Sequence, residues 1–123
     1  MATNSVSHKK DDLRDDAMDF AINVALEFEN VKGISVYTNQ LLRSSSSIGA
    51  NLHEGKYAQS RVDFIHKLEI ALKECYETEY WLELIYKIGR LPEEKYKALK
   101  NACGSIRRRL IASITTAKEN SKE

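Results

Sequence analysis

The chain has 123 residues, enough for one domain with a single core, and its hydrophobic content of 42% is ordinary for a soluble protein. A net charge of +1 is not the strongly basic balance typical of a nucleic-acid-binding domain. The sequence contains no apolar run near the roughly 20 residues of a membrane span and no N-terminal signal peptide, so we expect a cytoplasmic protein.

Residues 1–12 are polar and are predicted to form a disordered tail, and the first helix is predicted after them. It runs from about Leu13 to Val31, with an apolar stripe at helical spacing made of Leu13, Ala17, Phe20, Val24, Phe28 and Val31. The other side of this helix carries a second apolar strip made of Met18, Ile22, Ala25 and Leu26. The second strip indicates either a wide core face or a subunit interface.

The second helix is predicted from about Ser35 to Tyr57, straight through four consecutive serines at 44–47. Its apolar face comprises Tyr37, Leu41, Ile48, Leu52 and Gly55. Its polar face comprises Arg43, Ser47, Asn51 and Glu54. Both faces continue through the serines, so we interpret them as small residues that let a neighbouring helix come close. The alternative is a flexible serine-rich loop between two domains.

The polar face of this second helix contains two charges that need partners elsewhere. Arg43 and Glu54 are three turns apart and cannot pair with each other within one helix. Each is therefore predicted to meet a partner on another helix or subunit, in a polar network that Asn51 joins. The alternative is an ordinary solvated face.

The third helix is predicted to begin at Ser60–Asp63, which resembles a capping box. Its apolar stripe comprises Phe64, Leu68, Ala71, Leu72, Cys75, Leu82 and Tyr86. Glu79 falls within that stripe, and a buried carboxylate needs an arginine, a hydroxyl or a wet interface. Trp81 points away from the stripe, either as an exposed interface anchor or as a partly covered surface residue.

The fourth helix is predicted after Gly89–Glu94, a strong stop-and-restart signal, and continues to about Ala117. Its apolar stripe comprises Tyr96, Leu99, Cys103, Ile106, Leu110 and Ile114. From Leu91 to Lys118 seven basic residues outnumber two acidic ones, an excess of five charges. The candidate nucleic-acid-binding residues are Lys97, Lys100, Arg107, Arg108 and Arg109. The alternative is that these cations serve solubility and the C-terminal helix dipole. Residues 119–123 are predicted to be a polar tail.

Two blocks of this sequence carry a family resemblance. The first is the pattern Gln-Leu-x-Arg-Ser…Ser-Ile-x-Ala-Asn-x-x-Glu-Gly that starts at Gln40, and the second is Ala71–Leu82. Both resemble the four-helix-bundle proteins encoded in 23S rRNA intervening sequences of bacteria. The resemblance covers about Asp15 to Ala117.

The resemblance implies an all-α assembly in a ring-like homo-oligomer, typically a pentamer, without established enzymatic activity. A related branch, the accessory proteins of diversity-generating retroelements, binds nucleic acid and a reverse transcriptase. The expected partners are therefore other copies of the chain, RNA or DNA, and a protein such as a reverse transcriptase. The residues themselves predict an up-and-down antiparallel four-helix bundle over residues 13–118.

Catalytic and metal-binding motifs are weak in this chain. Asp63 and His66 are the nearest match to the paired Glu-x-x-His motifs of a di-iron bundle, so we expect neither metal nor cofactor. Cys75 and Cys103 fall on apolar faces and are predicted to be buried thiols, with a disulfide or a reactive thiol as the alternative.

One short motif supports an enzymatic alternative. Arg61 and His66 have the Arg-x4-His spacing that resembles the catalytic motif of HEPN-type ribonucleases, in which these residue types handle proton transfer and phosphate charge without metal. The plainer interpretation is a capping turn and a surface histidine. The sequence therefore favours a non-enzymatic oligomeric scaffold or adaptor, with a metal-independent ribonuclease as the alternative.

Overall fold

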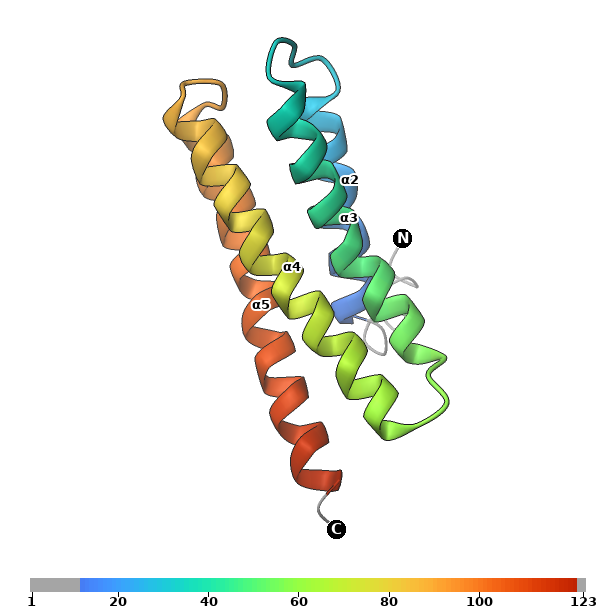
Figure 1. The fold of residues 1–123 in the computed structure, drawn as a ribbon. Coiled ribbons are helices and arrows are strands. Elements are labelled where there is room, and N and C mark those ends of the chain that lie inside the picture. Colours follow the sequence, from blue (N-terminus) through green and yellow to red (C-terminus); the bar gives the residue numbers. More distant parts are fainter. Residues whose placement is uncertain (1–11, 122–123) are drawn as a thin grey trace, which may run out of the picture.

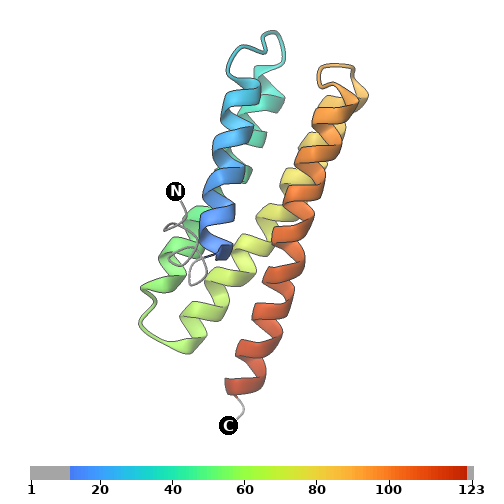
Figure 2. The same cartoon turned by 180° about the vertical axis from the view of Figure 1, so that it is seen from behind.

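Four helices joined by short loops make up residues 12–121, the part of the chain that the structure, a computed structural model, describes (Figure 1). They are α2 (Asp12–Phe28), α3 (Ser35–Lys56), α4 (Arg61–Lys87) and α5 (Glu93–Ser121). Successive helices run antiparallel, with α3 and α4 nearer the viewer in Figure 1 and α2 and α5 nearer in Figure 2. The described residues contain no strand, so the all-α prediction with four up-and-down helices is confirmed.

The helix boundaries differ from the predicted ones by a few residues. The first helix ends at Phe28 instead of Val31, before a turn in which Gly33 adopts φ +90°, a conformation that favours glycine. The last helix continues to Ser121, so residues 119–121 of the predicted C-terminal tail are helical. Residues 1–11 of the predicted N-terminal tail, and residues 122–123, lie outside the described residues.

The third helix begins as predicted. Ser60 is its N-cap, and the Ser60 hydroxyl accepts a hydrogen bond from the backbone N–H of Asp63 over 3.1 Å. This bond satisfies one of the backbone donors that a helix start leaves unpaired.

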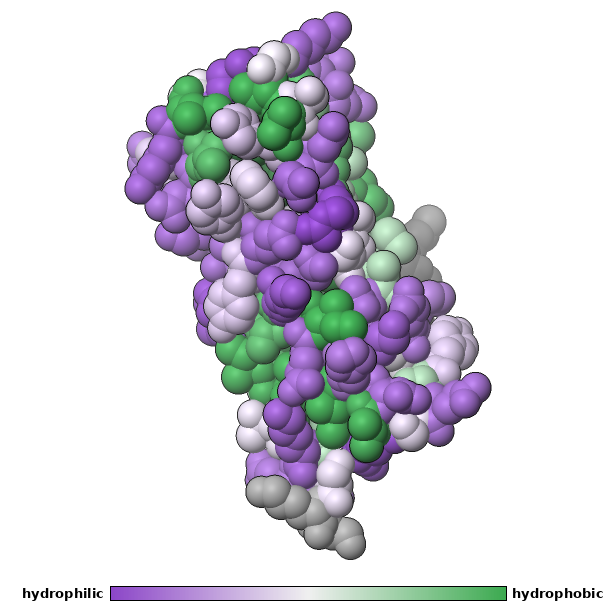
Figure 3. All heavy atoms as spheres, viewed as in Figure 1, coloured by the Kyte–Doolittle hydropathy of each residue, from purple (hydrophilic) through white to green (hydrophobic). Residues whose placement is uncertain are grey.

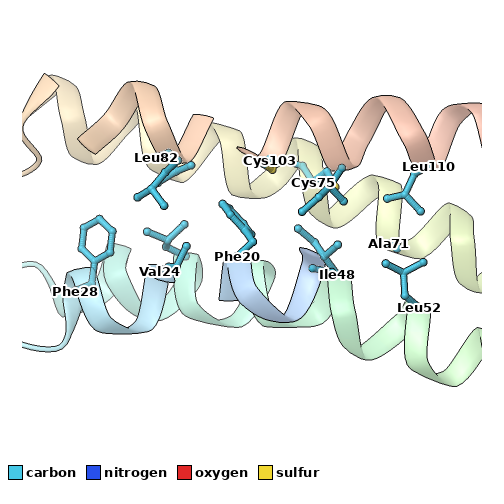
Figure 4. Close-up of a cluster of buried hydrophobic side chains, with 14 of the residues drawn as sticks. Phe20, Val24, Phe28, Ile48, Leu52, Ala71, Cys75, Leu82, Cys103 and Leu110 are labelled. Carbon is cyan, nitrogen blue, oxygen red and sulfur yellow. Dashed lines mark hydrogen bonds between the residues drawn. The ribbon is translucent and has the colours of Figure 1, made fainter. Parts of the chain in front are cut away.

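The core forms where the apolar stripes of all four helices meet, as Figure 4 shows for its labelled side chains. Phe20, Val24 and Phe28 of α2 are at most 3% exposed, and Leu82 of α4 is fully buried. The 3.6-residue period of the sequence therefore identified the buried face of each helix. The two cysteines also lie in this core and are free thiols.

The four serines lie within an unbroken helix, which excludes the flexible-loop alternative. Ser44 and Ser45 are almost completely buried, and each hydroxyl donates to a backbone carbonyl three residues earlier over 3.3 Å. Thr78 of α4, also fully buried, donates to the Ser44 hydroxyl over 2.9 Å. Small side chains that satisfy their own hydroxyls let α3 and α4 pack closely.

Helices that are consecutive in the sequence make the most extensive contacts with each other. The contact between α3 and α4 is the most extensive, whereas α2 contacts α5 much less than it contacts α3. The first helix has 17 residues and the last has 29, so α5 extends well beyond the N-terminal end of α2 (Figure 1).

Candidate interaction surfaces

A polar network joins α3 to α4 around Arg43. Its Nη1 atom donates to Glu74 over 3.4 Å, its Nη2 atom donates to Glu77, and its Nε atom donates to Gln40 over 3.4 Å. The hydrogen bond from Arg43 is the largest of the causes that lower the pKa of Glu77. The prediction that Arg43 finds its partner on another helix is confirmed.

The tryptophan belongs to the same cluster and is partly covered, which agrees with the second of the two alternatives and excludes a fully exposed anchor in the single chain. The Nε1 atom of Trp81 donates to Glu77 over 3.1 Å. Its ring stacks on Tyr37 of α3 with centroids 6.1 Å apart and meets Tyr80 edge-on at 5.0 Å. Because these contacts lie within one chain, Trp81 supports the subunit itself.

The second charge of the polar face also meets α4. Lys67 donates to Glu54 over 2.7 Å, and this bond lowers the pKa of Glu54. Asn51 behaves differently, because its amide donates to the backbone carbonyl of Ser47 in its own helix over 2.8 Å instead of to either ion pair. The predicted network therefore consists of two separate ion-pair groups, and Asn51 contacts α3 itself.

Glu79, which was expected to need a partner within the apolar stripe of α4, has one on α5. The Nε atom of Arg107 donates to it over 2.8 Å, and both side chains are about a quarter exposed, at 26% and 22%. The Arg107 guanidinium also lies over the ring of Tyr76, 5.7 Å from its centroid. The hydrogen bond that Arg107 donates to Glu79 raises the pKa of Arg107, which keeps the arginine charged.

Most cations of α5 are paired within the chain. Arg109 contacts Asp16 at 2.9 Å and Lys95 contacts Glu27 at 3.6 Å, so both tie α5 to α2. The remaining lysine pairs are Lys97 with Glu93 at 2.8 Å and Lys118 with Glu69 at 2.9 Å. These pairs offset much of the positive charge that the sequence places on this helix.

Two cations of α5 differ from the others. Within residues 12–121 neither Lys100 nor Arg108 forms an ion pair with a carboxylate. Lys100 lies over the ring of Tyr96, with its Nζ atom 5.6 Å from the centroid. Arg108 is exposed, and its guanidinium lies beside Gly104 of the same helix. The charge of Lys100 nevertheless acts on Glu83, whose pKa is lowered first by Lys87 and to a smaller degree by Lys100. Arg108 is therefore the predicted nucleic-acid-binding residue whose charge is least offset within the described residues.

The apolar strip of α2 predicted from the sequence lies on the surface. We call Met18, Ile22, Ala25 and Leu26 the α2 strip. Met18 is 62% exposed, Ile22 is 46% exposed and Leu26 is 60% exposed. The alternative of a wide core face is therefore wrong, because the core uses only the opposite stripe of α2. On the face over α3 and α4, hydrophilic side chains surround separate apolar patches (Figure 3).

Beside the α2 strip lies a groove of about 480 Å³ between α2 and α3, which we call the α2/α3 groove. Its lining is dominated by small side chains, namely Ala17, Ala21, Ser46, Gly49 and Ala50, and its other lining residues are Arg14, Asp15, Met18 and His53. The helices approach closely here, since a Cβ atom added to Gly49 would lie 3.5 Å from the Cβ of Ala17. Sequence analysis missed this groove, although small residues on both helices were visible.

The buried thiols are not a reactive site. The Cys103 thiol donates to the backbone carbonyl of Cys75 over 3.6 Å. A hydrogen bond with Cys75 and burial raise the pKa of the Cys103 thiol far above its usual range, so this thiol stays protonated.

Within the described part of the chain, no three histidine, cysteine, aspartate or glutamate side chains gather where they could hold a metal ion. Across residues 12–121, none of the helices has the length and hydropathy needed to cross a lipid bilayer.

Comparison with known proteins identifies the family. The family model described as "23S rRNA-intervening sequence protein" matches residues 9–112, which is most of the chain. This chain belongs to the 23S rRNA-intervening sequence protein family. A search of curated proteins finds no match.

A solved structure agrees with membership in the 23S rRNA-intervening sequence protein family. It is a protein of unknown function from the S23 ribosomal protein family of Bacteroides thetaiotaomicron. The two sequences are 42% identical, and the match covers 83% of this chain and 97% of the other at a TM-score of 0.78. The family and the fold are thereby shown.

In this member of the 23S rRNA-intervening sequence protein family, the two residues of the ribonuclease alternative lie at the start of α4. Arg61 and His66 are both exposed. Residues five positions apart point in directions about 140° apart around a helix. Arg61 lines a shallow hollow with Phe64 and Ala112, whereas His66 is not among its lining residues.

Proposed function

We propose that this protein is a non-enzymatic helical scaffold that assembles with copies of itself through the α2 strip. The observation that carries the proposal is the exposure of Met18, Ile22 and Leu26, at 62%, 46% and 60%, on successive turns of one helix. Covering the exposed part of each side chain contributes roughly 1 kcal/mol. Three such residues in line, beside a groove, are typical of an interface.

The arrangement of Arg61 and His66 supports a non-enzymatic role over the ribonuclease alternative. Acid–base catalysis on a phosphodiester requires both groups to reach one substrate. These exposed side chains leave α4 in different directions, and only Arg61 lines the nearby hollow. If the purified protein cut RNA in the presence of a chelator, and His66→Ala abolished cleavage with the helical signal intact, the scaffold proposal would be overturned.

Nucleic acid is a second candidate partner, favoured by the side of α5 that faces away from α2. By helical periodicity, Lys97, Lys100, Arg107, Arg108 and Lys118 share one side of this helix. Within residues 12–121, Lys100 and Arg108 form no ion pair with a carboxylate, so their charges are the least offset on this side. In a symmetric oligomer this side repeats, so its charge would accumulate. A partner protein such as a reverse transcriptase stays a prediction from the resemblance.

Sedimentation equilibrium tests the scaffold proposal. We expect the wild-type protein at micromolar concentration to be several times heavier than the 14.0 kDa chain, as the ring of five expected from the family resemblance would be. Ile22→Glu should reduce the mass, because it places a charge within the α2 strip. The matched control is Ile111→Glu on α5, a residue 40% exposed outside the strip, which should leave the mass unchanged. A wild-type protein found only at 14.0 kDa would overturn the proposal.

A further inference from the structure

The outer side of the contact between α4 and α5 carries tyrosines among cations. We call this surface the α4/α5 face, and it comprises Tyr76, Tyr80, Tyr96, Lys100, Arg107 and Arg108. Tyr76 and Tyr80 lie on successive turns of α4 and are 52% and 58% exposed. Helix α5 contributes the cations but only one aromatic residue, Tyr96. The combination therefore exists because the fold places α4 beside α5 (Figure 1).

Two of these cations lie over tyrosine rings of the same face. The guanidinium of Arg107 is 5.7 Å from the ring centroid of Tyr76, and the Nζ atom of Lys100 is 5.6 Å from that of Tyr96. The Tyr96 ring also stacks on Tyr86 of α4, with centroids 4.2 Å apart. A cation beside an aromatic ring offers a ligand a phosphate-binding group and a stacking surface close to each other.

Arg107 and Arg108 reach the same point, although consecutive residues leave a helix about 100° apart. A Cβ atom added to Gly104, which is buried, would lie 3.4 Å from Nη2 of Arg107 and 3.2 Å from Nη1 of Arg108. Glu79 bonds to Arg107, whereas Arg108 forms no ion pair within residues 12–121. Two guanidinium groups thus share one carboxylate, and a phosphate group between them would supply a second negative charge.

Two further carboxylates beside this face are bonded to lysines. Glu83 contacts Lys87 at 2.9 Å, and Glu69 contacts Lys118 at 2.9 Å. A polyanion bound here would therefore meet carboxylates whose charge is already offset, which reduces the repulsion between them.

The exposed tyrosines distinguish between two forms of nucleic acid. A duplex keeps its bases stacked on one another and presents phosphates to a protein surface, so it would use only the cations. A single strand has free bases that stack on aromatic side chains while its phosphates meet cations. Only the single strand would therefore cover the rings of Tyr76 and Tyr80 as well as reach the two arginines.

We infer that the α4/α5 face binds single-stranded nucleic acid, with a phosphate between Arg107 and Arg108 and bases stacked on Tyr76 and Tyr80. The inference rests on nucleic acid as the second candidate partner proposed above, and it adds the form of the nucleic acid and the contribution of α4. Because α4 and α5 form the side of the bundle opposite α2 and α3, self-assembly through the α2 strip leaves this face open.

Three labelled DNA probes of about 12 nucleotides, a length that single-strand-binding domains cover, test the inference by fluorescence anisotropy at low salt. They are a single strand, an abasic strand of the same length and charge, and the single strand paired with its complement. The wild-type protein should bind the single strand at least about fivefold more tightly than the abasic strand, because stacking of one base contributes a factor of about five or more. Equal affinity for these two strands would overturn the inference.

Replacing both tyrosines separates stacking from charge. The double variant Tyr76→Leu/Tyr80→Leu should bind the single strand at least about fivefold more weakly and should keep the wild-type affinity for the duplex, whose bases are not free to stack. The double variant Tyr76→Phe/Tyr80→Phe keeps both rings and should retain tight binding of the single strand. The matched control is Tyr57→Leu at the end of α3, 67% exposed and away from this face, which should change neither affinity. Unchanged single-strand affinity in the leucine double variant, or an equal loss for the duplex, would contradict the inference.

The salt dependence of binding provides an independent readout. The leucine double variant should keep the wild-type salt slope for the single strand, because a stacked base releases no counterion. Arg108→Gln should reduce that slope by about 0.7, the value for one phosphate contact of a single strand. Circular dichroism checks that each variant is folded, and Tyr80→Leu alone, at the more exposed position, replaces the leucine double variant if that one is not.

The possible results separate this inference from the proposed function. A wild-type protein that binds none of the three probes removes nucleic acid as a partner, and this inference with it. Binding without preference for the single strand over the abasic strand overturns this inference alone and leaves electrostatic binding of nucleic acid standing. Sedimentation equilibrium tests self-assembly independently of all these results.

Discussion

Arg107 of α5 donates to the carboxylate of Glu79 of α4 over 2.8 Å, and both side chains are about a quarter exposed. Glu79→Gln should lower the free energy of unfolding by about 1–2 kcal/mol, between the values for exposed and buried pairs, because it leaves a partly covered arginine without its counter-charge. Urea denaturation measures the difference. The matched control is Glu83→Gln, which removes an exposed pair with Lys87 within α4 and should cost clearly less than Glu79→Gln. Equal losses in both variants would contradict the prediction.

The Arg43 cluster predicts a pH dependence of stability. The pKa of Glu77 lies below its usual value of 4.5, first because Arg43 donates to it and second because Trp81 does. A carboxylate with a lowered folded-state pKa stabilises the fold above its unfolded pKa, and that contribution is lost as the pH falls through the folded-state pKa. The wild type should therefore lose stability below about pH 5, and Glu77→Gln should lose less over the same range.

Urea unfolding at neutral and acidic pH measures this difference. The effect should be below about 1 kcal/mol, because the cluster is partly solvent-exposed. Arg43→Gln should flatten the pH profile in a similar way, since Glu77 then lacks its first donor. If the stability of the wild type and that of Glu77→Gln changed with pH in parallel, the Glu77 carboxylate would contribute nothing to the pH dependence of the free energy of unfolding.

The buried serine predicts a strong size dependence. Ser44→Ala should lower the free energy of unfolding by about 1 kcal/mol, because it removes the hydroxyl to which the buried Thr78 hydroxyl donates. Ser44→Leu should cost more, about 2–3 kcal/mol, because the fully buried position at the contact of α3 with α4 has no room for a larger side chain. Thermal unfolding followed by circular dichroism orders the variants. The same change at Ser46, which is exposed, is the control and should be nearly neutral.

If α5 binds nucleic acid, the binding should depend on Lys100 and Arg108, which form no ion pair with a carboxylate within the described residues. Replacing Lys100 and Arg108 with glutamine should weaken retention of duplex DNA in a filter assay and reduce the salt slope by about two, since each lost phosphate contact removes about 0.9. Arg109→Gln is the control, because Arg109 contacts Asp16 on the opposite side of the helix. No retention of RNA or DNA by the wild type at low salt would remove nucleic acid as a partner.

The features that could be predicted from the sequence are those that depend on a single helix. The buried stripe of α2 and the unbroken helix through Ser44–Ser47 both follow from a 3.6-residue period within a single segment. The need of Glu79 for a partner also followed, because its position among apolar residues was visible along α4. The identity of that partner, Arg107, depends on how α4 and α5 are aligned, which no single helix contains.

What the sequence left open or missed has the same origin. It left both exposure and partial cover open for Trp81, and the cover comes from Tyr37 on another helix. The small residues of the α2/α3 groove were visible in each segment, but the groove itself arises only when Ala17 and Gly49 come together in the fold. The charge excess on α5 was counted correctly, but the carboxylates that offset it, such as Asp16, come from other helices.

The limited contact between α2 and α5 has a consequence for how the chain folds. The most extensive contact joins helices consecutive in sequence, α3 and α4, and the contact between α2 and α5 is the one that spans the whole chain. Chains with mostly local contacts fold quickly, because little loop entropy is lost before contacts form. We expect folding to begin in the α3–α4 hairpin and to finish as α2 meets α5. In stopped-flow refolding, Ser44→Ala should slow folding, whereas Asp16→Asn should mainly speed unfolding.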